Sequence, residues 1–201
     1  YLYSFFSDVK STELSNLYST YSTTFVNKPN RTNNLVLACR EINGLVLKPG
    51  EIFSFNDVVG QRTAAKGYKK ATVFVGKTNT SESIGGGVCQ VASTMFNTAL
   101  EGNFEIVERH QHSQRVSYVA LGRDAAIYWY STDFKFKNNT EYPIRIEMIC
   151  NEITRNLTCN IYTYDAVEKP DVDISVSKSG NTYTLKRSVD GENNYMAYSR
   201  Y

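Results

Sequence analysis

The clearest apolar pattern of the chain is a helical stripe that begins at Cys89 and stops before Gly102. Val91, Met95 and Ala99 recur at the spacing of one helix face, and glycine is a common stop signal for a helix. The same periodicity predicts two further helices in the first half of the chain. They cover residues 11–25 and 31–43.

After the Cys89 helix the pattern changes to a period of two, which is typical of strands with one buried face. Strands are predicted over residues 105–107, 116–119, 126–130, 134–137, 144–148, 158–162, 173–176 and 182–186. Earlier in the chain we expect strands at 52–55 and 71–76, one helical turn at 56–60 and a polar loop after residue 76. This order predicts an α+β fold, in which helices mainly from the N-terminal half pack on a mostly antiparallel β-sheet from the C-terminal half.

The length of 201 residues is enough for one domain with a substantial core and a small appendage. A weak boundary falls at Glu168-Lys169-Pro170, where the last predicted strands begin. We therefore expect one domain over residues 1–168 and a strand-rich C-terminal extension over residues 169–201.

The composition narrows the classes of partner. The net charge is +2 and the Lys and Arg residues are scattered rather than striped, so no nucleic-acid partner is expected. No apolar run is long enough for a transmembrane helix. The chain begins at Tyr1 without a signal-peptide pattern, and we expect any export signal or membrane anchor to lie upstream of it.

Candidate chemistry concentrates at Cys89. At the start of a helix, free backbone N–H groups and the helix dipole favour a thiolate and lower the pKa of the thiol. The three glycines at 85–87 would let another backbone, or a substrate, approach the sulfur closely. A lone cysteine on a buried helix can equally be an inert packing residue, and the residues alone leave both interpretations open.

The chain has two histidines, His110 and His112, which point to the same face if their segment is extended. Either is a candidate base for a cysteine nucleophile, and Asp124 or Glu108 is a candidate to orient that base. Asp124 could also be a plain turn residue. A zinc site made of Cys89 and both histidines is a further possibility, although we expect no metal and no cofactor.

The other cysteines predict structural roles. Cys150 and Cys159 stand at the ends of two adjacent predicted strands, so a hairpin would bring them close enough for a disulfide in an exported protein. Cys39 lies among the apolar residues of a predicted helix and is expected to be a buried, unreactive thiol.

Several motifs resemble those of VanW-type domains, in the family's order, over about residues 11–148. They lie at residues 31–44, 47–56, 85–91, 108–109, 112–113, 116–118, 122–125, 136–140 and 143–144. One departure follows Cys-Gln-Val, where Ala92-Ser93-Thr94 stands in place of the more usual Ser-Thr-Thr. It leaves the cysteine unchanged.

This resemblance implies an exported protein on the extracellular face of the cell envelope of a Gram-positive bacterium, often one that follows a membrane anchor. Some VanW domains are cysteine L,D-transpeptidases that form 3-3 cross-links between peptidoglycan stem peptides. Applied to this chain, the resemblance implies Cys89 as the nucleophile, His112 in preference to His110 as the base, and Asp124 as its orienting group. Backbone N–H groups from Val88 to Gln90 would stabilise the oxyanion.

Residues expected to contact the substrate are Gly86, Gly87, Gln90, Ser113, Arg115 and Arg123. Of these, Arg115 or Arg123 would bind a substrate carboxylate, although either could be a solvated surface charge. Two other functions stay open. The first is a non-catalytic peptidoglycan-binding module, and the second, ranked below it, is a zinc hydrolase. The oligomeric state is also left open.

Overall fold

The computed structural model describes residues 14–165 and 167–201. Its main sheet is antiparallel with the strand order β1-β9-β8-β2. The four strands are β1 (Asn16–Thr24), β9 (Asn156–Thr163), β8 (Ile144–Asn151) and β2 (Val46–Leu47). Two helices pack on this sheet, α1 (Pro29–Ile42) against β8 and α3 (Cys89–Glu101) against β1 and β9.

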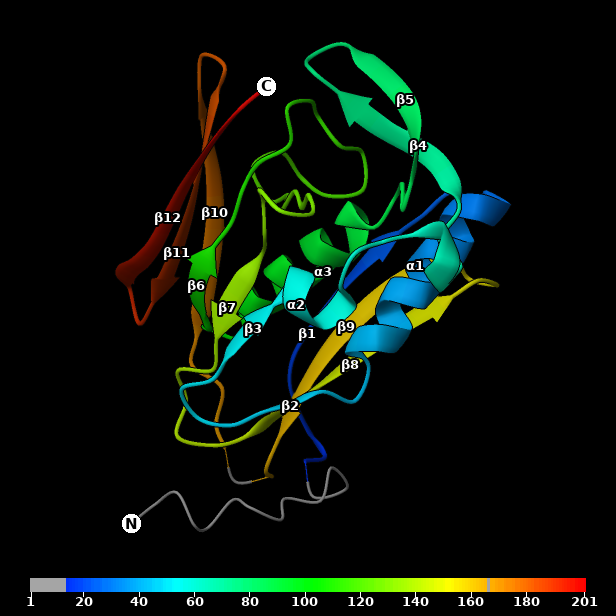
Figure 1. The fold of residues 1–201 in the computed structure, drawn as a ribbon. Helices are drawn as coiled ribbons and strands as arrows, with labels where there is room; N and C mark the ends of the chain where they lie inside the picture. The colour runs from blue at the N-terminus through cyan, green and yellow to red at the C-terminus, as the bar shows by residue number, and fades with distance from the viewer. Residues whose placement is uncertain (1–13, 166) are drawn as a thin grey trace.

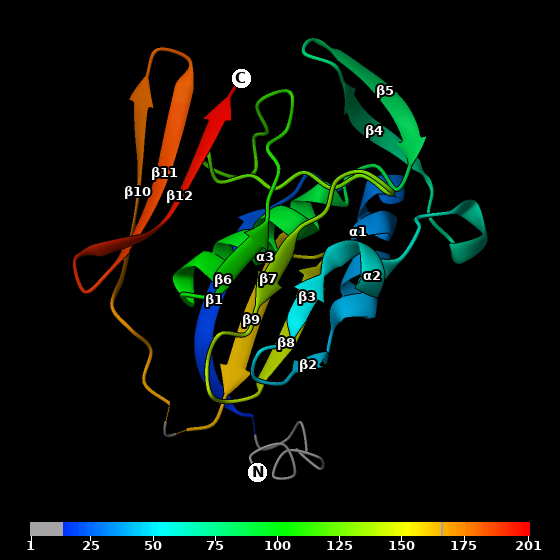
Figure 2. The same cartoon turned by 60° about the vertical axis from the view of Figure 1, so that its left-hand side comes forward.

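A second, three-stranded sheet lies on the other side of α3, as Figure 2 shows. Its order is β3-β7-β6, with β3 (Ile52–Ser54), β7 (Lys135–Lys137) and β6 (Glu105–Glu108). The short helix α2 (Phe55–Val59) continues directly from β3. Phenylalanines from this sheet meet α3, where the rings of Phe96 and Phe134 pack edge to face with centroids 5.9 Å apart.

Helix α3 is therefore buried on nearly every side, and its polar residues have partners inside the protein. The Asn97 amide donates to the carbonyl oxygens of Ser93 and Arg123, at 2.7 and 2.8 Å. Thr94 shares a hydrogen bond of 2.9 Å with Thr23 of β1. Because buried polar groups are costly only when unpaired, these bonds let a helix with many small polar residues occupy the centre of the fold.

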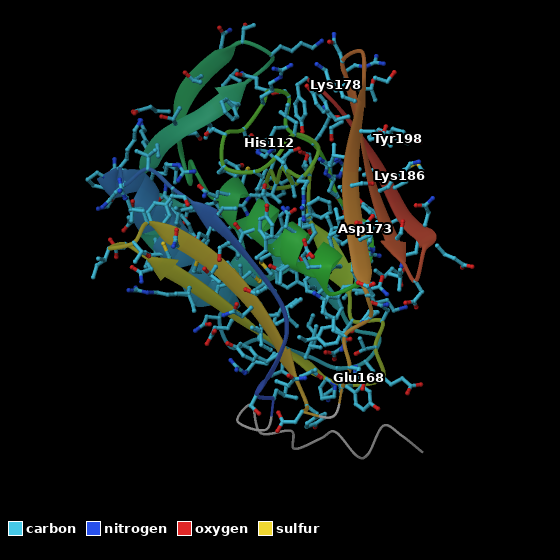
Figure 3. All side chains as sticks on the ribbon, turned by 180° about the vertical axis from the view of Figure 1, so that it is seen from behind. His112, Glu168, Asp173, Lys178, Lys186 and Tyr198 are labelled. Atoms are coloured by element: carbon cyan, nitrogen blue, oxygen red, sulfur yellow. The ribbon has the colours of Figure 1, made fainter. Side chains whose placement is uncertain are left out.

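Two smaller sheets stand on either side of the upper part of the molecule (Figure 1). One is the hairpin of β4 (Lys70–Val75) and β5 (Asn79–Ile84), which follows the short 3₁₀ helix η2 (Ala64–Lys66). The other is the antiparallel sheet of β10 (Val172–Ser179), β11 (Thr182–Val189) and β12 (Glu192–Arg200). His112 lies between them (Figure 3).

The α+β prediction is confirmed, and so are the helices expected at 31–43 and from Cys89 onward. The helix expected at 11–25 is wrong: residues 16–24 form β1, and residues 11–13 lie outside the described part of the chain. Leu14, Leu17 and Tyr18 do follow helical spacing, but the segment is rich in Ser, Thr and Tyr, which suit a pleated surface, and it pairs with β9.

Three other local predictions are corrected. Residues 116–119 and 126–130 are not strands; the second segment makes isolated bridges only, through Ala126 and Tyr128. The loop expected after residue 76 is mostly strand β5, which pairs with β4. The expected list of strands also lacked β12.

The predicted Cys150–Cys159 disulfide is wrong, because all four cysteines are free. The β8–β9 register places Cys150 opposite Leu157 and Cys159 opposite Met148, so the two cysteines are diagonal rather than facing. Cys39 is buried, as expected. Among the described residues, no helix has both the length and the apolar character needed to cross a membrane.

The predicted extension at 169–201 packs closely on the rest of the chain. Leu185 of β11 is fully buried in the same core as α3, and the ring of Tyr195 packs edge to face on Phe96. The side-chain amide of Gln111 makes two hydrogen bonds with the backbone of Arg200 in β12, at 2.7 and 2.8 Å. The last sheet therefore borders the segment that carries His112.

Candidate active site

Cys89 is the first residue of α3 and opens onto a cavity of about 1070 Å³, called here the Cys89 cavity. The residue is partly exposed, and its sulfur lies 3.5 Å from the carbonyl oxygen of Ile127. The start of the helix is the position that the sequence predicted. There the helix dipole favours a thiolate.

The three glycines before Cys89 each make room for a different neighbour. A Cβ on Gly86 would lie 2.3 Å from the carbonyl oxygen of Ala71, so the backbone of β4 needs a glycine there. A Cβ on Gly85 would lie 2.8 Å from Cβ of Arg62, and one on Gly87 would lie 2.7 Å from Cγ of Arg31. Gly85 and Gly87 also have positive φ angles of 84° and 99°, which L side chains rarely adopt. The expected close approach is therefore made by the protein itself.

His112 connects the thiol to a buried carboxylate. Its Nδ1 lies 2.6 Å from Oδ2 of Asp124, and its backbone N–H donates to the same oxygen at 2.6 Å. The side chain of His112 also lies close enough to Cys89 for each group to shift the pKa of the other. The hydroxyl of Tyr118 lies 3.5 Å from Nε2, and the ring of Phe74 from β4 packs edge to face on the imidazole. The ring is thus fixed on each side.

Asp124 is fully buried and is held by charge and hydrogen bonds. Arg109 forms an ion pair with its Oδ1 at 2.9 Å, and the hydroxyl of Tyr201 donates to the same oxygen. Arg109 also donates to the backbone oxygen of Asp124 at 2.7 Å and to Oγ of Ser199 at 2.9 Å. Residues of the last sheet therefore help to position this carboxylate.

The pKa values in this group favour an imidazolium–thiolate pair. Burial opposes the charged form of His112, but its hydrogen bonds to Asp124 and Cys89 prevail and raise its pKa to about 9. Burial likewise opposes the thiolate, but hydrogen bonding to His112, the charge of His112 and the charge of Arg62 lower the pKa of Cys89. The same balance applies to Asp124. Burial opposes its ionised form, but the hydrogen bond to His112 and the charge of Arg109 lower its pKa. Asp124 and His112 are therefore charged near neutral pH, and their arrangement favours the thiolate form of Cys89.

His110 and Glu108 are not part of this group. His110 is exposed, and its Nε2 lies 2.9 Å from Oε1 of Glu108. Within residues 14–165 and 167–201, no three His, Cys, Asp or Glu side chains are grouped so that they could hold a metal ion. The structure thus brings Cys89 together with one of the two candidate histidines.

The residues expected to contact substrate divide into two groups. Gly87 and Ser113 line the Cys89 cavity. Gly86 and Gln90 are buried, and the side chain of Gln90 bonds to Arg31, Thr23 and Thr24 instead.

The two arginines expected to bind a carboxylate do not line the Cys89 cavity. Arg115 is exposed to solvent. Arg123 forms an ion pair of 3.0 Å with Glu101 at the far end of α3 and stacks over the ring of Tyr21.

Four residues of the site were not found from the sequence: Arg31, Arg62, Tyr118 and Tyr201. The first three line the cavity beside Cys89, and Tyr201 holds Asp124. Arg31 and Tyr118 do lie within motifs that resemble the family, and those motifs were a usable signal. Nothing local distinguishes Arg62 and Tyr201 from surface residues.

Comparison with known proteins accounts for the shared motifs. The family described as VanW like protein matches residues 30–162, a stretch that includes Cys89, His112 and Asp124. The chain belongs to the VanW family. Membership of this family suggests a cell-wall-related protein.

Two known proteins are each similar to more than half of the chain. One is Uncharacterized protein YoaR of Bacillus subtilis (strain 168), 46% identical over 125 residues, which are 61% of this chain and 41% of that protein. The other is Vancomycin B-type resistance protein VanW of Enterococcus faecalis (strain ATCC 700802 / V583), 35% identical over 123 residues, or 58% of this chain and 44% of that protein. The chain thus spans less than half the length of these relatives. No solved structure matches it.

Proposed function

We propose that this VanW domain is a cysteine L,D-transpeptidase of the cell envelope that forms 3-3 cross-links between peptidoglycan stem peptides. The observation that carries the proposal is the buried imidazole of His112, held between Asp124 and Cys89 at the wall of an open cavity. Such an arrangement of thiol, imidazole and carboxylate suits acyl transfer. The family's link to the cell wall supports a peptidoglycan substrate on the extracellular face.

In the first half of the reaction, the Cys89 thiolate attacks the carbonyl carbon at the L-centre of diaminopimelate in a tetrapeptide stem. The tetrahedral oxyanion collapses to a thioester, the bond to the terminal D-alanine breaks, and the imidazolium of His112 protonates the leaving amine. The N–H groups of Val88 and Gln90 donate to the carbonyl oxygens of Gly85 and Gly87, so we assign the oxyanion to the N–H of Cys89 itself.

In the second half, the side-chain amine of another stem attacks the thioester carbonyl. His112 accepts the proton of that amine, the new amide bond forms, and Cys89 leaves as a thiolate. If water attacks in place of the amine, the product is a free tripeptide carboxylate. The domain would then act as an L,D-carboxypeptidase.

The test is incubation of the domain with disaccharide-tetrapeptide, followed by mass spectrometry of the products and of the intact protein. We expect a cross-linked dimer, release of D-alanine and a thioester on Cys89, all lost in Cys89→Ala. Cys150→Ala removes another partly exposed thiol and should keep the activity. The absence of both dimer and tripeptide with the unaltered protein would overturn the proposal.

The same samples distinguish the alternative of a non-catalytic peptidoglycan-binding module. A binding module has no need of a reactive thiol, whereas the lowered pKa of Cys89 predicts fast alkylation at neutral pH. Alkylation by iodoacetamide no faster than that of free cysteine would favour the binding module.

A further inference from the structure

Two arginines flank the thiol, although they come from distant parts of the chain. Arg31 lies in the first turn of α1 and packs against Gly87, while Arg62 lies in the loop after α2 and packs against Gly85. Both line the Cys89 cavity, and Arg31 also lines an adjoining cavity of about 600 Å³. The glycine turn therefore holds two guanidinium groups beside the nucleophile.

Neither of these arginines is neutralised by a carboxylate of the described residues. Elsewhere in the fold, the largely buried side chains of Arg109 and Arg123 form ion pairs with Asp124 and Glu101 at 2.9 and 3.0 Å. Among residues 14–165 and 167–201, no ion pair involves Arg31 or Arg62. Partly buried charges are usually paired, and the nearest negative group that acts on both arginines is the thiolate form of Cys89. Two cations beside one thiolate leave positive charge in the cavity for an anionic ligand.

The hydrogen bonds of the two side chains lead to the same conclusion. Arg31 Nη2 donates to Oε1 of Gln90 at 2.6 Å, but Arg31 Nη1 is buried and no described residue accepts a hydrogen bond from it. Arg62 Nη1 donates to Asn56 and to the backbone of Gly60, at 2.7 and 2.9 Å. Its guanidinium also lies over the ring of Trp129, 5.6 Å from the ring centroid. Both guanidinium groups are thus held by neutral partners, and each has further N–H donors that could bind a ligand.

We propose that Arg31 and Arg62 form a carboxylate-binding site that holds the terminal D-alanine carboxylate of the donor stem peptide. The inference rests on the proposed function, because that reaction places a free carboxylate two bonds beyond the scissile nitrogen. A ligand group so close to the attacked carbonyl has to lie in the part of the cavity next to Cys89. A guanidinium fork is well matched to a carboxylate.

This site also determines which peptides serve as donors. A stem that ends in a free D-alanine presents its carboxylate to the two cations, while a stem whose terminus is amidated leaves them unpaired. A buried charge without a partner is costly, so the amide is selected against as well as poorly attracted.

The experiment measures binding without turnover, on the full chain carrying Cys89→Ala. Isothermal titration calorimetry compares disaccharide-tetrapeptide with the same compound amidated at its terminal carboxylate. We expect the acid to bind roughly tenfold or more tightly than the amide. In the additional presence of Arg31→Gln or Arg62→Gln, this ratio should fall toward one. Arg40→Gln, an exposed position on the same helix as Arg31, should keep it.

Equal binding of acid and amide by the Cys89→Ala protein would overturn the proposal. An acid-to-amide affinity ratio that stays unchanged in both the Arg31→Gln and the Arg62→Gln variants would also overturn it. Thermal unfolding of each variant shows whether it is folded. If Arg31→Gln does not fold, Gln90→Glu replaces it, because a carboxylate against Arg31 Nη2 would compete with the ligand and lower the same ratio.

The outcome is separable from that of the proposed function. If the protein binds the acid more tightly than the amide but forms no thioester, the carboxylate site is supported and the transpeptidase function is refuted. If it forms the thioester equally well from acid and amide, the transpeptidase function is supported and the carboxylate site is refuted.

Discussion

Replacing Asp124 by asparagine tests the central claim about the site, which is that this carboxylate keeps His112 protonated beside the thiolate. The shift of the His112 pKa from 6.5 to about 9 corresponds to about 3 kcal/mol of preference for the imidazolium. In Asp124→Asn the charge is gone while burial still opposes protonation, so we expect the pKa of His112 to fall by roughly 1–3 units. The asparagine NH₂ can also face Nδ1, which would favour the wrong tautomer of the ring.

The measurement is an NMR titration of the imidazole signals, made in a His110→Gln background so that one histidine remains. A second readout is the pH profile of alkylation of Cys89 by iodoacetamide. The depressed pKa of the thiol depends on an imidazolium that exists below about pH 9, so in Asp124→Asn the alkylation profile should move to higher pH. Cross-linking activity should fall by roughly 10²–10⁴-fold, the usual contribution of a positioned acid–base group.

Asp133→Asn is the matched control. Asp133 is also a buried carboxylate with several bonds, accepting from Ser54 Oγ at 2.6 Å and from the backbone N–H of Asn56 at 2.9 Å. Its loss should destabilise the fold without moving the titration of His112. The reasoning is refuted if His112 of the unaltered protein titrates near 6.5, or if both asparagine variants change the alkylation profile equally.

Two further predictions concern the supports of the site. Tyr201→Phe removes a hydrogen bond to Asp124, so the free energy of unfolding in urea should fall by about 1 kcal/mol. Tyr198→Phe, at an exposed position, should leave it unchanged, and equal effects of the two would contradict the role of Tyr201. Gly86→Ala places a methyl group against the backbone of Ala71 and should cost roughly 1–3 kcal/mol, measured as a lower Tm; an unchanged Tm would show that β4 can move away.

Local patterns predicted the helices of this fold better than its first strand. α3 was found because its apolar repeat is regular and a glycine follows it. β1 was missed because Leu14, Leu17 and Tyr18 fit a helix, and only pairing with β9 shows that the segment is extended. No pattern within residues 14–24 themselves predicts that pairing.

The same division holds for the site. Cys89 and His112 could be predicted because a glycine-flanked cysteine and a rare histidine pair are conspicuous in the sequence. Arg62 and Tyr201 could not be predicted, because each reaches the site through contacts with residues far along the chain, Gly85 and Asp124. The electrostatics of the cavity therefore depend on tertiary packing that no short motif encodes.

The glycine turn before Cys89 has a consequence for how this family can vary. At Gly85 and Gly87 the obstacle to a larger residue is an arginine side chain together with a positive φ, so a smaller residue at 62 or 31 would relieve part of the conflict. At Gly86 the obstacle is the main chain of β4, which is present whatever residue occupies position 71. Compensating substitutions can therefore accompany changes at the two outer glycines, but none can accompany a change at the middle one.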